Sequence, residues 1–293
     1  SSSGEEVSCD MYAFPEDIHV GSNITFWVEV PEIPQDGTTT IYIYYGNSTV
    51  SNVWNGEATF LFFDDFETDL SKWTEVGTNA ISRSTEVAID GSYSLKVVDD
   101  NTEAEEGGYT TFSAGTKYHV FLHWRTPSTS GLRNDLRIGI DDCSDVTAEV
   151  GVHFRADETG GTPAGFQYYD TAWHNIMDIN ADTWYKLEFF VDTDTDTFDL
   201  YVDGVQKLND ASFRNALSSI SAFRIVHGAA KTGTCFIDQM FVRKYVDPEP
   251  SHGSWGTEEE QVGAIEKSVN AILLLFSSLS SLVSFGKEGK VCL

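Results

Sequence analysis

The chain has 293 residues, of which 46 are acidic and 18 are basic, so its formal net charge is -28. Surfaces that bind nucleic acid or anionic lipid need clustered lysine and arginine, so this charge argues against both as partners. Hydrophobic residues make up 41% of the chain, which is enough for a buried core and indicates one large domain with appendages.

The first 59 residues are predicted to form a partial N-terminal β module. Residues 23–30 alternate polar with apolar side chains, and residues 38–45 form a β-branched and aromatic run. This pattern predicts two strands joined by a turn at residues 31–37. Because two or three strands bury too little surface to be stable alone, we expect the module to pack on the next domain or on another chain.

Residues 60–246 are predicted to form an antiparallel jelly-roll β-sandwich, so the chain is all-β. Short alternating or β-branched and aromatic runs follow one another here, with turn signals between them and no long helical periodicity. The predicted strands span residues 92–98, 117–125, 136–140, 149–155, 184–192, 197–202, 222–227 and 234–244.

A Pro/Gly/Glu-rich linker at residues 247–261 precedes a predicted C-terminal hydrophobic helix at residues 262–293. No charged residue occurs from Ser268 to Gly286, although serines interrupt its second half. A membrane span needs roughly 20 mostly apolar residues, and small residues allow helices to pack closely. A membrane anchor, an oligomerisation helix and an ordinary docked helix therefore all remain open.

Acidic side chains flank both ends of the predicted sandwich. Asp65 and Glu67 follow its first strand, and Asp238 lies in its last strand. The first and last strands of a jelly roll lie side by side, so these carboxylates could share one structural Ca²⁺, which accepts mixed oxygen ligands. The alternative is that acidic residues cap strand ends, as in any acidic protein.

The scarce basic residues fall on the non-core face of three predicted strands. Side chains of a strand alternate between faces, so if these strands are neighbours one sheet face carries them all. They are His119, His123, Arg125, Arg137, His153 and Arg155. Stacking platforms for a sugar are available nearby at Phe166, Tyr168, Tyr169 and Trp173. The basic residues and aromatic rings together predict a ligand groove. The alternatives are that the basic residues simply pair with carboxylates of the chain, or that the histidines form a metal site.

The four cysteines show no Cys-x-x-Cys spacing, which argues against a zinc ribbon or a thioredoxin motif. Cys143 and Cys235 both lie within the β-rich segment and are predicted to form a disulfide if their loops meet. Cys9 and Cys292 are candidates for a second bond within or between chains.

Four segments carry a resemblance to a known family. They are residues 25–34, 40–47, 62–67 and 242–250. Together they resemble a prokaryotic domain-of-unknown-function family of surface proteins, which commonly precedes a concanavalin-like or laminin-G-like jelly roll. The resemblance implies a cell-surface location and no known catalytic activity. Only about two dozen residues precede the first segment, so we expect either cleavage or a partner that supplies missing strands.

The leading hypothesis is a non-catalytic extracellular structural or adhesive protein that is a subunit of a larger surface assembly. No Gly-x-Ser-x-Gly, His-Glu-x-x-His or Glu-x-Asp-x-x-Glu run indicates an enzyme. A surface-displayed carbohydrate-binding module is the alternative, followed by a glycan-processing enzyme. The expected partners are copies of the chain, a membrane or partner protein bound through the C-terminal helix, and glycans. Sequons at Asn23 and Asn47 would permit N-glycosylation of a secreted chain.

Overall fold

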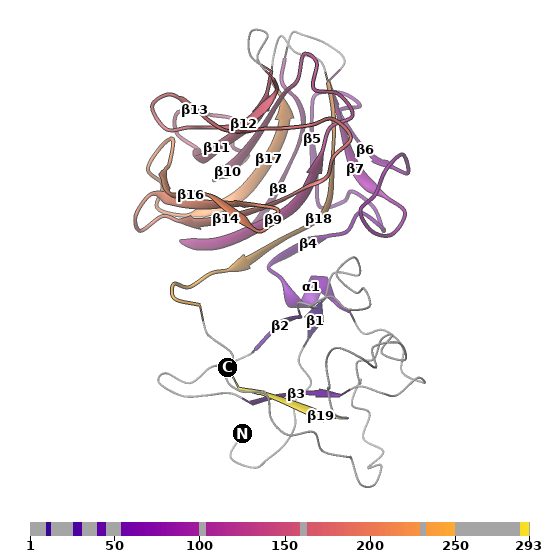
Figure 1. The fold of residues 1–293 in the computed structure, drawn as a ribbon, viewed down its shortest axis with the longest axis vertical. Coiled ribbons are helices and arrows are strands. Elements are labelled where there is room, and N and C mark those ends of the chain that lie inside the picture. The colour runs from indigo at the N-terminus through magenta and orange to yellow at the C-terminus, as the bar shows by residue number, and fades with distance from the viewer. Residues whose placement is uncertain are drawn as a thin grey trace. The chain divides into compact units, whose positions relative to one another are not determined.

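The computed structural model describes residues 10–12, 26–30, 40–44, 54–99, 104–158, 163–228, 233–249 and 288–292. The chain divides into two units, which are considered separately (Figure 1). One unit is Leu61–Tyr245 and contains the sandwich. The other combines Ser1–Phe60 with Val246–Leu293.

The sandwich unit contains a seven-stranded antiparallel sheet in the order β13-β12-β11-β10-β17-β8-β5. Its strands are β5 (Thr74–Val76), β8 (Glu106–Gly115), β10 (Arg133–Gly139), β11 (Val150–Asp157), β12 (Gly165–Tyr169), β13 (Trp173–Asp178) and β17 (Ile220–His227). Consecutive strands pair from β10 to β13, whereas the pairs β10-β17, β17-β8 and β8-β5 join strands distant in sequence, as the long crossovers of a jelly roll require.

The second sheet is eight-stranded and antiparallel, in the order β16-β15-β14-β9-β18-β7-β6, with β4 also paired to β18. Its strands are β4 (Phe62–Asp64), β6 (Ile81–Ser84), β7 (Ser94–Asp99), β9 (Lys117–Arg125), β14 (Tyr185–Asp192), β15 (Thr197–Val202), β16 (Val205–Ser212) and β18 (Gly233–Lys244). The predicted all-β jelly-roll sandwich is confirmed.

The two sheets enclose one large hydrophobic core. In β9 the predicted core face is confirmed, because Tyr118, Val120, Leu122 and Trp124 are at most 2% exposed. The Trp124 indole N–H donates to Asn134 Oδ1 on β10 at 2.8 Å, so one hydrogen bond joins the two sheets through the core. Burial of such a polar pair costs little free energy of folding only while both partners of the hydrogen bond are present.

The first and last strands of the sandwich lie side by side, as the sequence predicts. Phe63 of β4 is opposite Phe241 of β18, and Asp64 is opposite Met240. A register shift between Asp238 and Phe241 interrupts the pairing of β18 with β9. This irregularity lies next to the acidic residues that the sequence singles out.

The N-terminal segment pairs differently from the predicted hairpin. In the described part of that unit, β1 (Met11–Tyr12) pairs with β2 (Trp27–Val28). The second predicted strand, β3 (Thr40–Tyr44), pairs instead with β19 (Glu288–Cys292). The same unit also contains a short helix, α1 (Gly56–Thr59). Asn55 caps its N-terminus, since the Asn55 side chain accepts a hydrogen bond from the Ala58 N–H. The hairpin prediction is therefore wrong, because β2 pairs with the preceding strand β1, and β3 pairs with β19 near the C-terminal end.

The predicted C-terminal helix is not found where the structure describes that region. Residues 288–292 form a strand, and residues 250–287 lie outside the described residues. No helix among the described residues is long and apolar enough to cross a membrane. The sequons at Asn23 and Asn47 also lie outside the described residues.

Replacing Trp124 with Phe should destabilise the sandwich. The change deletes the donor to Asn134 Oδ1 and leaves a small cavity between the sheets, so we expect the free energy of unfolding to fall by about 2 kcal/mol. Urea denaturation measures this directly. Val205→Thr is the control, because the Val205 side chain is exposed and its replacement should have little effect. Equal stability of W124F and wild type would contradict the role of this hydrogen bond.

Acid should destabilise the protein partly through His227. Its Nδ1–H donates to the Arg133 carbonyl at 3.2 Å, and burial lowers the pKa of the imidazole to about 4. The unfolded chain takes up this proton near pH 6.5 and the folded chain only near pH 4, so stability falls as the pH drops between these values. For this residue alone we expect a loss of about 2 kcal/mol at pH 5 relative to pH 7. Urea titrations of wild type and His227→Gln at both pH values should differ by that amount in their pH dependence.

Candidate functional site

A polar face lies on the outer side of the seven-stranded sheet. In β10, Leu136 and Ile138 point into the core, so Asp135 and Arg137 point outward. The register places Arg137 opposite His153 of β11 on one side and Arg224 of β17 on the other. We call this the arginine face, made of Arg133, Asp135, Arg137, His153, Arg155, Arg214 and Arg224.

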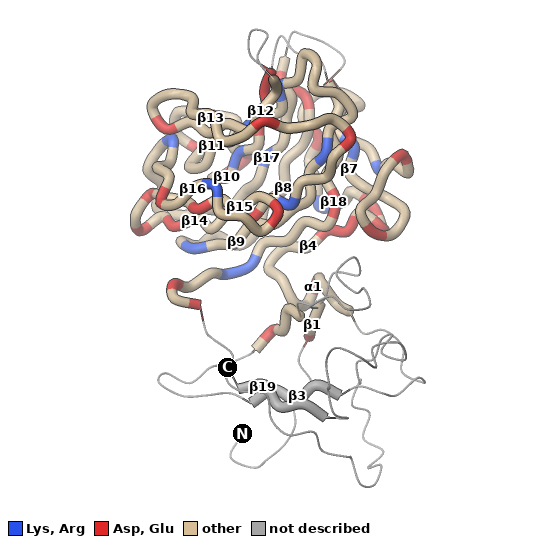
Figure 2. Tube along the Cα trace, in the orientation of Figure 1, with Lys and Arg blue, Asp and Glu red and all other residues tan. Residues whose placement is uncertain are grey.

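The arginine face contrasts with the rest of the acidic chain. Figure 2 shows acidic residues mostly in the loops and turns of the sandwich, whereas arginines occur within the strands β10 and β17. Arginine binds carboxylates through a planar fork of N–H donors, so the chemistry of this cluster suits anionic or hydroxyl-rich groups.

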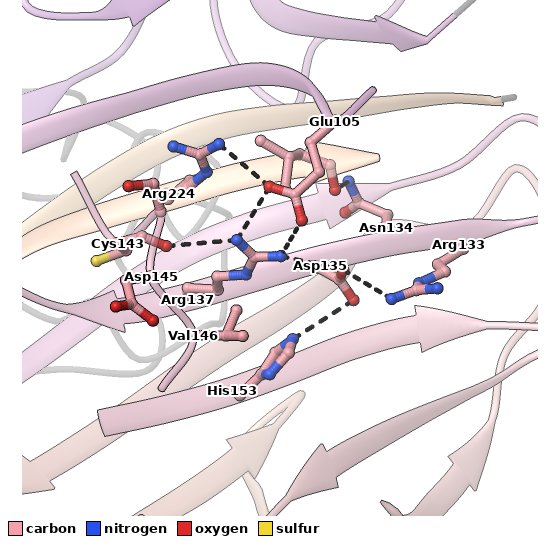
Figure 3. Close-up of polar contacts among 12 residues, drawn as sticks. Glu105, Arg133, Asn134, Asp135, Arg137, Cys143, Asp145, Val146, His153 and Arg224 are labelled. Atoms are coloured by element: carbon pink, nitrogen blue, oxygen red, sulfur yellow. Dashed lines mark hydrogen bonds and ion pairs between the residues drawn. The ribbon is translucent and has the colours of Figure 1, made fainter. Parts of the chain in front are cut away.

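Asp135 is fully buried at the centre of the arginine face. Its carboxylate lies 3.5 Å from Arg137 Nη2, 3.6 Å from Arg133 Nη2 and 3.6 Å from His153 Nε2 (Figure 3). Burial alone would raise the pKa of Asp135, but His153 and the two arginines lower it to about 2. Asp135 is thus a fixed negative charge that holds the arginines together.

One ring nitrogen of His153 accepts a hydrogen bond, and the other lies 3.6 Å from Asp135 Oδ1. Arg214 Nη1 lies 2.9 Å from Nδ1, and since a guanidinium can only donate, Nδ1 accepts and the ring proton belongs to Nε2, which faces Asp135. Burial lowers the pKa of His153, and the charges of Arg137 and Arg214 lower it further, against the opposing effect of Asp135. The imidazole is therefore neutral at neutral pH.

Aromatic rings line one edge of the arginine face. The Arg155 guanidinium lies 3.5 Å from the ring centroid of Trp173, and that of Arg214 lies 4.3 Å from the centroid of Tyr169. His153 meets the Trp173 ring edge-on at 4.9 Å. Both Trp173 and Tyr169 are partly exposed, so this edge combines accessible rings with fixed cations.

The structure divides the predicted groove between two sheets. Arg137, His153 and Arg155 do share a face, but His119, His123 and Arg125 lie on β9 in the other sheet. The prediction of one continuous face is therefore wrong, because sequence alternation assigns faces but not neighbours. His119 and His123 are buried, and His119 stacks on Phe190 with ring centroids 4.3 Å apart.

The predicted stacking platforms are also divided. Tyr169 and Trp173 lie at the edge of the arginine face, whereas Phe166 is fully buried in the core. Tyr168 packs against the core residue Phe198 and stacks on His174, so its prediction as a groove residue is wrong. Sequence reasoning missed Asp135, Arg214 and Arg224 as partners. The alternation of β10 could have revealed Asp135, but no local pattern marks the other two.

The predicted calcium ligands come close together near the β4–β18 pairing. Asp238 is buried and accepts from the N–H groups of Ile89 at 2.7 Å and Gln239 at 2.8 Å. Burial raises the pKa of its carboxyl to about 8. Glu67 accepts from the N–H groups of Ser92 and Tyr93.

Asp65 and Asp90 complete this acidic cluster. Burial raises the pKa of Asp90, and the negative charges of Glu67 and Asp65 raise it further. These carboxylates therefore interact electrostatically. Among the described residues, however, no group of three or more His, Cys, Asp and Glu side chains is placed to hold a metal ion. Backbone amides occupy several of the carboxylate oxygens instead, and calcium binding stays a prediction.

The predicted disulfide between Cys143 and Cys235 is absent, and both residues are free thiols. Cys143 packs with Val150 and Ala222 on the outer side of the seven-stranded sheet, whereas Cys235 lies in the core on β18 of the other sheet. The loops that were expected to meet belong to different layers. Burial raises the pKa of the Cys143 thiol to about 12, so it is unreactive at neutral pH. A pairing of Cys9 with Cys292 lies outside the described side chains.

Comparison with known proteins gives a family match for part of the chain. Residues 16–76 match the family described as Domain of unknown function (DUF2341). This segment overlaps the N-terminal part of the resemblance seen in the sequence. No curated protein matches the chain.

Similar solved structures share the β-sandwich fold. A sialidase matches with a TM-score of 0.51 at 15% identity, over 63% of this chain and 18% of the sialidase chain. An endo-β-1,4-glucuronan lyase from the fungus Trichoderma reesei matches with a TM-score of 0.46 at 13% identity, over 64% of this chain and 96% of the lyase. A xylan-binding domain from Paenibacillus barcinonensis has a TM-score of 0.34 at 15% identity, over 63% of this chain and 94% of the domain. At these identities the likeness shows the fold alone.

If calcium binds the acidic cluster, a chelator should lower the melting temperature. An ion that binds only the folded state stabilises it by about 2.7 kcal/mol at a hundredfold excess over its dissociation constant. We expect EGTA to shift the wild-type melting curve downward and added Ca²⁺ to restore it. Asp238→Asn should melt at the same temperature with and without EGTA. A wild-type curve that does not move with chelator would rule out the site.

Proposed function

We propose that the arginine face binds a glycan. The observation that carries this proposal is the edge where partly exposed Trp173 and Tyr169 rings lie against the Arg155 and Arg214 guanidinium groups. Aromatic rings pack against the apolar faces of sugars, while arginine donates to their oxygens. A cation covers one face of each ring, so the partial exposure of the rings leaves apolar surface for a ligand.

The polar groups beside these rings are held in place before any ligand arrives. Arg155 Nε donates to Gln167 Oε1 at 2.8 Å, and its Nη2 pairs with Asp157 at 2.9 Å. Gln167 Nε2 in turn donates to Asn175 Oδ1 at 2.7 Å. Fixed side chains lose little conformational entropy on binding. The hydrogen-bonded row of Arg155, Gln167 and Asn175 therefore supports recognition of an extended ligand across β11, β12 and β13.

The groups on this face favour binding without catalysis. A general base needs a free lone pair, but the lone pair of His153 Nδ1 accepts from Arg214, and Nε2 carries the ring proton. Glycoside hydrolysis needs a protonated carboxyl as the acid, whereas the pKa of Asp135 is about 2 and Asp157 pairs with Arg155. These contacts support a binding function for the arginine face.

We place this glycan binding at the cell surface, as an adhesive function of an extracellular protein. The excess of acidic residues supports a solvent-exposed chain that avoids anionic lipid and nucleic acid. The structural-assembly hypothesis depends on the C-terminal segment, which lies mostly outside the described residues. Among the described residues, the arginine face supports glycan binding as the leading hypothesis.

Trp173→Ala should weaken glycan binding about tenfold or more, because it removes a stacking surface and the partner of Arg155. A glycan array identifies a ligand for the wild type, and isothermal titration calorimetry then compares the variants. Tyr201→Ala is the matched control, because Tyr201 is a partly exposed aromatic residue on β15 of the other sheet.

Two results would contradict the proposal. Binding that Trp173→Ala and Tyr201→Ala reduce equally would place the ligand elsewhere. A wild type that binds no glycan but sediments as a large assembly would favour the structural hypothesis.

A further inference from the structure

Two arginines on neighbouring strands share a single carboxylate. Arg137 holds both oxygens of Glu105, with Nη1 at 3.1 Å from Oε2 and Nη2 on Oε1, and Arg224 Nη2 lies 3.2 Å from Oε2 (Figure 3). We call Arg137 and Arg224 the arginine clamp. Their side chains are 2% and 5% exposed, whereas that of Glu105 is 30% exposed. Glu105 is therefore the most exposed of these three side chains.

The clamp is anchored independently of Glu105. Arg137 Nη1 also donates to the Cys143 carbonyl at 3.3 Å, and Arg224 Nη1 donates to the Asp142 carbonyl at 3.2 Å. Asp135 lies on the other side of Arg137 at 3.5 Å. These contacts come from the strand and the loop after it, so the guanidinium groups keep their positions when Glu105 moves away.

The clamp also has spare donors. The Nε groups of Arg137 and Arg224 are buried without a hydrogen-bond partner among the described residues. The charges around the clamp are balanced, because three arginines (Arg133, Arg137 and Arg224) face three carboxylates (Asp135, Asp142 and Glu105). Withdrawal of Glu105 therefore leaves one uncompensated positive charge. Buried cations are strongly destabilising without a counter-charge, so Glu105 can leave only in exchange for another anion.

We infer that the arginine clamp recognises the carboxylate of an acidic sugar, and that Glu105 is an internal substitute which this ligand displaces. The inference rests on the proposed glycan binding and names the ligand class of the same face. A planar carboxylate fits the fork that Glu105 now fills. The sugar ring that carries it would lie on the sheet face that also bears the exposed Trp173 and Tyr169 rings.

Glu105 is placed to make this exchange. It precedes the first residue of β8, Glu106, so it is not held by strand pairing itself. Its neighbour Glu106 is buried, and β8 is paired with β17 from that residue onward. The Glu105 side chain can therefore rotate away without loss of a backbone hydrogen bond of the sheet.

The first experiment uses the wild-type chain with matched ligand pairs. Oligomers of glucuronate, galacturonate and sialic acid are compared by calorimetry with their methyl esters, which keep the sugar ring but lack the charge. A panel of neutral oligosaccharides is measured alongside. We expect the acids to bind at least about tenfold more tightly than the esters, because charged partners strengthen arginine hydrogen bonds.

The second experiment weakens the internal competitor. Glu105→Gln keeps the shape of the side chain but removes its charge, so acidic glycans should bind about tenfold more tightly while neutral glycans are unaffected. Glu86→Gln is the matched control, because Glu86 makes an exposed ion pair with Lys96 on the other sheet and should not change either affinity. The ligand pairs need no variant, so equal binding of acids and esters still overturns the inference if E105Q does not fold.

The outcomes separate this inference from the proposed function. Equal binding of acids and esters, with no effect of E105Q, would overturn the clamp and leave glycan binding intact. A preference for acids that E105Q does not strengthen would also overturn it, because the preference would then arise elsewhere. If no acidic or neutral glycan binds either the wild type or E105Q, glycan binding itself fails.

Discussion

The register of β10 between β11 and β17 is the constraint on which the rest of the sandwich depends. Because side chains alternate, this register places Leu136 and Ile138 in the core and Asp135 and Arg137 outside. A slip by one residue would move two charged groups into the core and two aliphatic groups onto the surface. The fold and the arginine face are therefore two consequences of the same strand pairing.

Burial gives the arginine face its chemical character. Burial disfavours an ionised carboxyl, and Asp135 stays ionised because the His153 N–H and the Arg133 and Arg137 cations oppose that effect. Burial and the charges of Arg137 and Arg214 in turn keep His153 neutral. The result is a rigid polar surface whose charges are set by one another, which suits recognition better than proton transfer.

The acidic cluster near the β4–β18 pairing shows the opposite electrostatic pattern. Asp238 has amide donors but carries a raised pKa, because burial and the charge of Asp90 outweigh them. Both the arginine face and the acidic cluster contain a buried aspartate, but the groups that surround it differ in charge. Arginines satisfy the carboxylates of one site, whereas the carboxylates of the other rely on backbone amides or on a cation.

The sequence alone located many of the sandwich strands and their faces, because the alternation of side chains is a local property, but it left β5, β6, β8, β12, β13 and β16 unassigned. It placed Lys117–Arg125 and Thr197–Val202 where the structure has β9 and β15, and it paired the first strand of the sandwich with the last. Only the tertiary structure decided which strands are neighbours, since crossovers of a jelly roll join segments that share no local signal. It therefore separated β9 from β10 and kept Cys143 apart from Cys235. It also brought in partners that no local pattern marks, namely Glu105, Arg214 and Arg224.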